Sequence, residues 1–126
     1  DHGFFEISAG VDNKRIEEVL YAVLEECRKL KKFEVPEEEM NKVKECLIGN
    51  MKLSLESSDD IANFHGGQEL LKREILGAEE KAKRIREVTA KDILVLSKEI
   101  FKNEKLNLAL IGPFKDKAKF EKLLKL

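Results

Sequence analysis

The sequence predicts an α+β fold: a helix-rich fragment of two layers with two visible strands of a larger mixed sheet. Two stretches of alternating apolar and polar residues, one near each end of the chain, are typical of half-buried strands. Elsewhere, apolar residues recur at helical spacing. Because an isolated two-stranded sheet is only marginally stable, we expect partner strands in sequence upstream of Asp1 and treat residues 1–126 as a single partial domain.

The first strand is predicted over residues 4–11, where apolar side chains occupy every second position from Phe5 to Val11. Asp12 follows as a helix cap, and we expect a helix over residues 13–33. The apolar positions of this helix are Ile16, Val19, Leu20, Val23, Leu24, Cys27 and Leu30.

A second, long helix is predicted over residues 36–56. Pro36 suits a first helical position, and Glu37–Glu39 suit the positive end of the helix dipole. The buried stripe of this helix is expected to be Met40, Val43, Leu47, Met51 and Leu55.

The third helix is expected over residues 58–76, opened by a capping box between Ser57 and Asp60 and stopped by Gly77. Gly66–Gly67 interrupts its pattern, which predicts either a kink or a place where another backbone comes close. Its apolar stripe is Ile61, Phe64, Leu71 and Ile75.

The rest of the chain is predicted to form two shorter helices, a strand and a closing helix. The helices are expected over residues 79–87 and 90–103, the strand over 106–111, and the closing amphipathic helix over 115–125. Gly112–Pro113 ends the strand. The expected stripe of the helix over 90–103 is Ile93, Leu96, Ile100 and Phe101.

Composition excludes several classes of function. With 24 basic and 25 acidic residues, the net charge of −1 removes the usual electrostatic basis for binding nucleic acid. No apolar run approaches the roughly 18 residues of a membrane span, so we expect a soluble protein. Cys27 and Cys46 lie in helical patterns and are expected to be buried, reduced thiols, which favours a cytoplasmic location.

The residues that could carry chemistry do not combine into a site. The two histidines, His2 and His65, have no second histidine one helical turn away, so neither HxxEH nor HExxH occurs. His65 and Glu69 share a turn, and we interpret them as a helix-surface pair. Neither cysteine has a histidine nearby in sequence. We therefore predict no catalytic and no metal-binding residue in this chain, and the sequence leaves substrate-binding residues open.

Four stretches, taken in order, resemble a known family. They are GFFEISAGVDNKRIEEVL, KECLIGNMKLSLESSDDIA, QELLKREILGAEEKAKRIREVTAKDILVLSKEIF and LNLALIGP. Their order and spacing resemble the second half of the non-catalytic C-terminal domain of insulinase/pitrilysin-type zinc metallopeptidases, the family that includes the mitochondrial processing peptidases. The resemblance runs from Gly3 to Pro113.

The resemblance implies a half-domain of an enzyme built from two homologous α+β halves that close over a peptide. The zinc ligands, HxxEH and a downstream Glu, lie in the other, catalytic half. The family's Glu pair, whose second member binds zinc, aligns here with Gly49 and Asn50. Asn50 is a neutral amide, and Gly49 suggests close helix packing. The resemblance therefore implies no cofactor in this fragment and zinc in the parent enzyme's catalytic half.

Two functions follow from this resemblance. In the first, the chain is a non-catalytic C-terminal fragment of a zinc metalloendopeptidase, inactive alone, that forms chamber and closure surface for peptide hydrolysis by an HxxEH-bearing half. In the alternative, it is an inactive partner or core subunit of a heterodimeric, processing-peptidase-like complex. Its expected partners are that catalytic half and peptide substrates, and we expect the isolated fragment to form a homodimer through its first strand.

Overall fold

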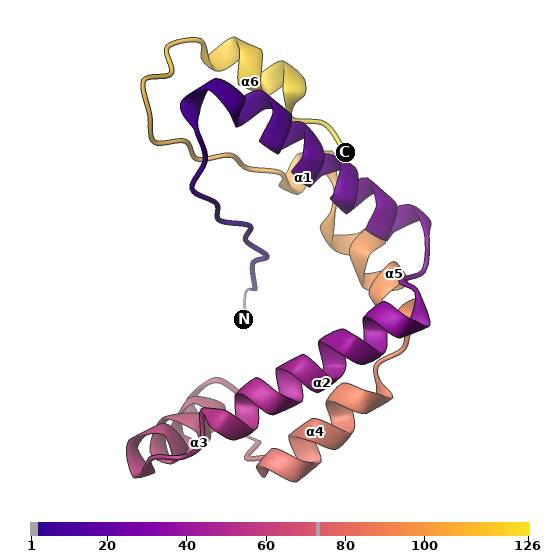
Figure 1. Cartoon of the computed structure of the whole chain (residues 1–126), viewed down its shortest axis with the longest axis vertical. Helices are drawn as coiled ribbons and strands as arrows, with labels where there is room; N and C mark the ends of the chain where they lie inside the picture. Colours follow the sequence, from indigo (N-terminus) through magenta and orange to yellow (C-terminus); the bar gives the residue numbers. More distant parts are fainter. Residues whose placement is uncertain (1–2, 73) are drawn as a thin grey trace. The chain divides into compact units, whose positions relative to one another are not determined.

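The computed structural model describes residues 3–72 and 74–126, and helices account for all of the regular secondary structure in these ranges (Figure 1). The elements are η1 (Asn13–Arg15), α1 (Ile16–Lys32), α2 (Glu37–Leu53), α3 (Ser58–Lys72), α4 (Ala78–Glu87), α5 (Ala90–Ile100), η2 (Asn103–Lys105) and α6 (Lys117–Leu123). The α-helices lie within the ranges in which the apolar periodicity predicts them, apart from Ala78 at the start of α4, whereas two of the three residues of η2, Glu104 and Lys105, lie beyond the predicted range 90–103.

The predicted α+β class is wrong for the described residues. Residues 4–11 and 106–111, expected to be strands of a larger sheet, form neither strand nor helix and are drawn as coil in Figure 1. The physical reason is that alternation indicates an extended chain with two unlike faces, whereas a strand also needs backbone partners. Within the described ranges these two segments pair neither with each other nor with another segment.

Local capping explains where several helices begin. The Asp12 carboxylate accepts a hydrogen bond of 2.9 Å from the Lys14 backbone N–H at the start of η1, as the sequence predicts. The Ser57 hydroxyl oxygen likewise accepts from the Asp60 N–H (3.1 Å) and donates to the Asp60 carboxylate (2.6 Å). These contacts confirm the caps predicted at Asp12 and at Ser57–Asp60. Pro36, by contrast, precedes the first residue of α2 rather than occupying it.

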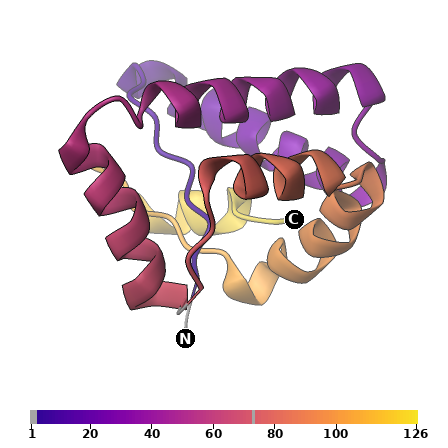
Figure 2. The same cartoon turned by 90° about the horizontal axis from the view of Figure 1, so that it is seen from below.

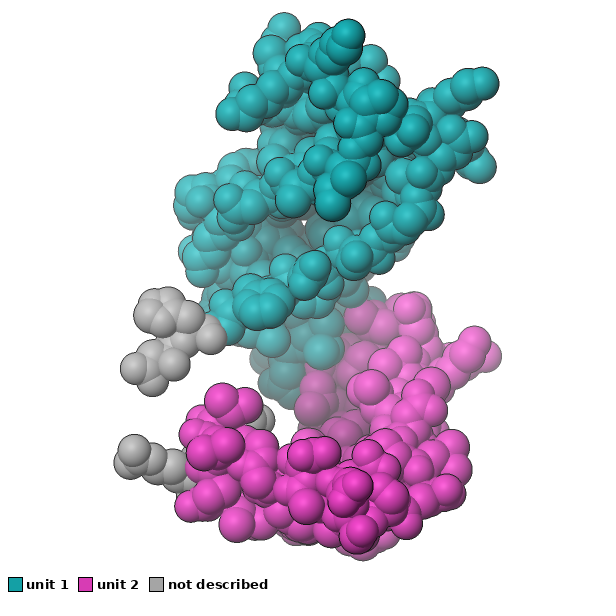
Figure 3. All heavy atoms as spheres, turned by 90° about the vertical axis from the view of Figure 1, so that its left-hand side faces the viewer, with its two compact units in different colours: residues 1–34, 91–126 teal, residues 35–90 magenta. Residues whose placement is uncertain are grey.

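The chain divides into two compact units, which Figure 3 distinguishes by colour. Unit 1 comprises residues 1–34 and 91–126, and unit 2 comprises residues 35–90. Sequence periodicity alone does not reveal this division, because it locates helices without showing which of them pack together.

In unit 1, α6 lies beside α1 with the same direction (Figures 1 and 2). Near their starts, Lys119 forms an ion pair of 2.5 Å with Glu17. Near their ends, the Arg28 guanidinium donates to the Lys125 carbonyl. The buried residues of this unit are Leu20, Leu24, Cys27, Ser97 and Phe101. Unit 1 is thus a helical core to which the chain's last residues are tied.

In unit 2, α2 and α4 pack side by side in opposite directions (Figures 1 and 2). Lys52 near the end of α2 pairs with Glu79 near the start of α4 at 2.8 Å. At the other end of the pair, Glu45 forms a salt bridge of 3.0 Å with Arg86. Ile48 and Ala82 are buried, with exposed fractions of 3% and 0%. This helix pair is the core of unit 2.

The buried face of α2 is not the predicted stripe. Val43 and Leu47 are about half exposed, at 49% and 52%, whereas Ile48 is buried. The helix carries apolar residues around much of its circumference, so periodicity supplies two candidate faces. Contact with α4 selects the one that contains Ile48. Leu96 of α5 was also expected in an apolar stripe, but it is 51% exposed, so this part of the prediction is wrong as well.

The glycine pair in α3 does not interrupt the helix. α3 runs continuously through Gly66 and Gly67, and nothing described in the structure lies within 4 Å of the position that a Cβ would take at either residue. The expected kink or close backbone approach is therefore wrong for this part of the chain. Gly77, expected to stop the helix, instead precedes the first residue of α4.

Candidate functional site

The histidines do not form a metal site in the described part of the chain. His2 lies outside the described residues. His65 is half-buried on α3, with its ring edge-on to the Phe64 ring at 5.1 Å, and its buried Nδ1 has no hydrogen-bond partner among the described residues. No group of three or more His, Cys, Asp or Glu side chains in residues 3–72 and 74–126 could hold a metal ion. The zinc of the resembled family does not fit these residues.

The aligned pair on α2 carries no ligand geometry either. Asn50 is exposed, and its amide donates a weak hydrogen bond of 3.6 Å to the Cys46 sulfur. No described atom lies within 4 Å of a Cβ built at Gly49, so the interpretation of Gly49 as a close helix contact is wrong here. A neutral amide that binds its own helical neighbour leaves this position without a metal-binding role.

The two thiols differ in environment. Cys27 is buried in α1 with an exposed fraction of 6%, and burial raises the pKa of its thiol. Cys46 is exposed, so its predicted burial is wrong. The reason is again the choice of face on α2, since Cys46 lies on the side turned away from Ile48. Both cysteines are free. A buried thiol with a raised pKa is a poor nucleophile, which agrees with a structural role for Cys27.

A small pocket lies between α3, α4 and the link that joins them, and the sequence did not predict it. Its volume is about 270 Å³. The lining residues are Gln68, Glu74, Leu76, Lys81, Arg84, Ile85 and Val88. The link is held in place by the buried Gln68 side chain, whose amide donates to the Leu76 carbonyl and accepts from the Leu76 N–H, both at 3.2 Å. Residues 68 and 76 meet only through this fold, so no local motif could have revealed the pocket.

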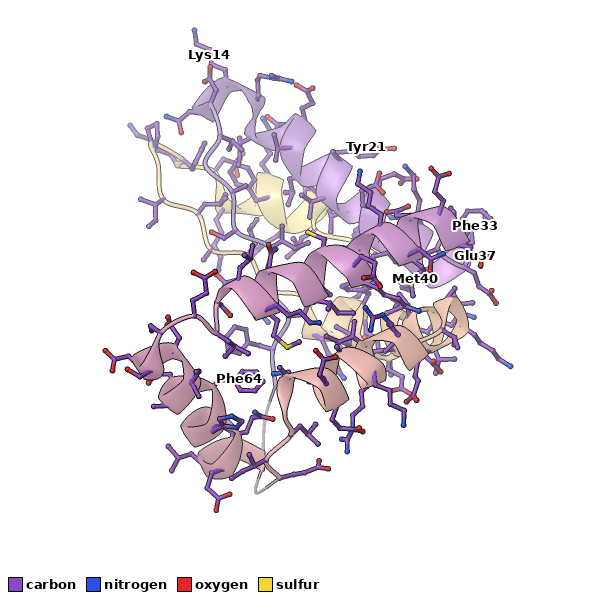
Figure 4. The ribbon with its side chains drawn as sticks, turned by 60° about the horizontal axis from the view of Figure 1, so that its bottom comes forward. Lys14, Tyr21, Phe33, Glu37, Met40 and Phe64 are labelled. Carbon is purple, nitrogen blue, oxygen red and sulfur yellow. The ribbon has the colours of Figure 1, made fainter. Side chains whose placement is uncertain are left out.

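Charged groups line the pocket alongside its apolar side chains. Arg84 binds both carboxylate oxygens of Glu74, at 2.7 and 3.3 Å, and this hydrogen bonding raises the pKa of Arg84. The Lys81 ammonium lies 4.6 Å from the centre of the Phe64 ring, which points from α3 toward α4 (Figure 4). These charges already have partners within the unit. The lining has no cysteine, serine or histidine, so it offers a place for an apolar group rather than a reaction centre.

Large apolar side chains remain exposed on several helices. On α2, we name Val43, Leu47 and Leu53 the outer face; their exposed fractions are 49%, 52% and 67%. On α3, Leu70 and Leu71 are more than four-fifths exposed. Tyr21 of α1 also projects into solvent (Figure 4). Apolar side chains that stay in contact with water gain free energy when another surface covers them.

Comparison with protein-family models finds a match at the start of the chain. Residues 1–47, which run through α1 into α2, match the model of the Peptidase M16 inactive domain. The resemblance to the C-terminal domain of insulinase-type metallopeptidases is confirmed over these residues. Searches of the curated proteins and of the solved structures found no match. In the described ranges, no helix has both the length and the apolar character needed to cross a membrane.

Proposed function

We propose that this chain is a non-catalytic C-terminal part of a zinc metalloendopeptidase, and that it supplies chamber and closure surface to a catalytic half. The match of residues 1–47 to the Peptidase M16 inactive domain carries this proposal. The chain's part in peptide hydrolysis is to enclose and orient the substrate rather than to react with it.

Two features of the described residues support a surface role. The outer face of α2 and the end of α3 present large apolar side chains that gain free energy when another protein surface covers them. Asn50, His65 and the two cysteines, in contrast, do not assemble a ligand set. Zinc bound in the HxxEH-bearing half would activate the attacking water, and no residue described here takes part in that step.

Reconstitution tests the proposal. The chain is co-expressed with the HxxEH-bearing half encoded by the same genome, and peptidase activity is measured with and without a chelator. We expect a stable complex whose chelator-sensitive activity exceeds that of either half alone. Asn50→Ala is the matched control, because an exposed amide without a metal should leave both zinc content and activity unchanged. A catalytic half that is equally active without this chain would contradict the proposal.

The same experiment separates the alternative function. If the genome encodes no HxxEH-bearing partner, or if the complex forms without peptidase activity, the chain is an inactive partner or core subunit of a heterodimeric complex. The partner would cover the same surfaces of this chain under either function, so only the partner's peptidase activity distinguishes the two functions.

A further inference from the structure

We propose that residues 3–11 form an interaction surface for a second copy of this chain, through antiparallel pairing of the two segments about Ile7. This inference is independent of the proposed function, because it concerns the chain's association with itself. It rests on the backbone, the side-chain pattern and the anchoring of this one segment.

The backbone of the segment is open to a partner. Residues 3–11 belong to no helix or strand, and no backbone hydrogen bond within the described ranges involves them. Residues 3–10 are exposed, with Phe4 at 90%, Phe5 at 57% and Ile7 at 51%, and Val11 is half-buried. An extended stretch with free N–H and C=O groups and apolar side chains is a template for pairing with another strand.

The segment is also anchored at both ends, which lowers the entropic cost of pairing. The Phe5 ring packs edge-on against the buried Phe101 ring, with 5.3 Å between centroids. At the other end, Asp12 caps η1 through its carboxylate and its carbonyl accepts from the Arg15 N–H at 2.9 Å. Unit 1 therefore presents this segment already attached to its own surface.

The pattern of side chains is complementary to itself in one register. In an antiparallel pair related by a two-fold axis at Ile7, Phe5 lies opposite Ala9 and Glu6 lies opposite Ser8. Large residues then face small ones, and the only charge in the segment faces a hydroxyl. A pair centred on Glu6 would place two carboxylates opposite each other, which is destabilising.

A neighbouring register is also excluded. Centring the pair on Ser8 avoids the opposed carboxylates, but it pairs Asp12 with Phe4 and so competes with the cap of η1. Centring on Ile7 pairs all nine residues from Gly3 to Val11 and leaves Asp12 in place. It also keeps the apolar alternate positions of both copies on one face, on the side where Phe5 meets Phe101. Each unit 1 then covers part of the new two-stranded ribbon, which would be marginal if left uncovered.

Disulfide trapping tests the register directly. In a Cys46→Ser background, Ile7→Cys places two thiols opposite each other at the two-fold axis, within bridging distance. Gly10→Cys is the matched control: it is exposed, nothing described lies within 4 Å of its Cβ position, and its two copies would be about 20 Å apart along the ribbon. We expect the Ile7→Cys dimer to form about tenfold faster or more on mild oxidation. Equal rates for the two variants would overturn the proposal.

Sedimentation of the full chain at tens of micromolar provides the second readout. We expect a species of twice the 14.5 kDa chain mass. Successive N–H groups of a strand point to opposite edges, so either Ile7→Pro or Ser8→Pro must remove a ladder donor and return the monomer. Circular dichroism checks that the helices persist in both variants. A monomeric parent chain, or a dimer that survives both substitutions, contradicts the proposal. So does a result in which the backbone amides of residues 3–11 are protected from hydrogen exchange only when a catalytic half is added.

Discussion

Single side chains on α2 decide which helical face carries the stability of unit 2. Ile48 is 3% exposed and lies on the side of α4, whereas its neighbour Leu47 is 52% exposed. We predict that Ile48→Ala lowers the free energy of unfolding by about 2–4 kcal/mol, since it leaves a cavity in the helix pair. Leu47→Ala is the matched control and should cost less than about 1 kcal/mol. Urea denaturation followed by circular dichroism measures the free energy of unfolding of both variants. A larger loss for Leu47→Ala than for Ile48→Ala would show that the stripe predicted from periodicity is the buried one.

Glycines at two positions should respond in opposite ways to the same added methyl group. Gly66 lies inside α3 with open space around its Cβ position, so Gly66→Ala should stabilise the chain by about 0.5–1 kcal/mol. At Gly112 a Cβ would lie 2.5 Å from a ring carbon of Phe114, whose ring packs against Phe120. Gly112→Ala should therefore destabilise it by about 1–2 kcal/mol. Thermal unfolding of the two variants measures these effects. If Gly66→Ala lowered the melting temperature, another backbone would approach α3 at this position.

At the scale of helices, acidic pH should weaken the contact between α2 and α4. Hydrogen bonding to Arg86 lowers the pKa of Glu45, and hydrogen bonding to Lys52 lowers the pKa of Glu79. A carboxylate whose folded-state pKa is lowered contributes stability above its unfolded-state pKa, near 4.5, and loses it as pH falls through the folded-state value. We predict that the melting temperature falls between pH 7 and pH 3.

The Glu45→Gln, Glu79→Gln double variant supplies the control for this pH effect. It should show a smaller fall over the same range, because the two carboxylates that titrate between the helices are gone. Both pairs are solvent-exposed, so added salt should also reduce the difference between the variant and the parent chain. An unchanged pH profile in the double variant would show that these pairs do not hold α2 against α4.

The helices could be predicted from the sequence because caps and apolar periodicity depend on residues that are close together in the chain. Asp12 and the Ser57–Asp60 pair cap helices through contacts within three residues, and periodicity located each amphipathic segment. The prediction of strands was wrong, since residues 4–11 carry the alternation of a strand but have no backbone pairing partner in the described chain. The pocket was missed for the same reason: Gln68 and Leu76 meet through tertiary folding rather than through a motif.

At the scale of the whole molecule, the chain divides into two units and exposes large apolar side chains, which the proposed surface role would cover. The family match covers residues 1–47, while the ion pairs that hold unit 2 together involve α4, beyond the matched stretch. The resemblance read from the sequence extends over that region as well. Under the proposed function, this chain supplies a supporting surface and the metal chemistry lies in a separate half.

The zinc content of the purified chain tests whether this chain is non-catalytic. After dialysis against buffer containing micromolar zinc, the parent chain and the Asn50→Glu variant are analysed for bound metal and for cleavage of an unstructured peptide. We predict substoichiometric zinc and no peptidase activity for both, because a single added carboxylate supplies at most one of the three protein ligands that catalytic zinc requires. Close to one zinc per chain, with chelator-sensitive cleavage in either protein, would contradict the assignment of this chain to the non-catalytic half.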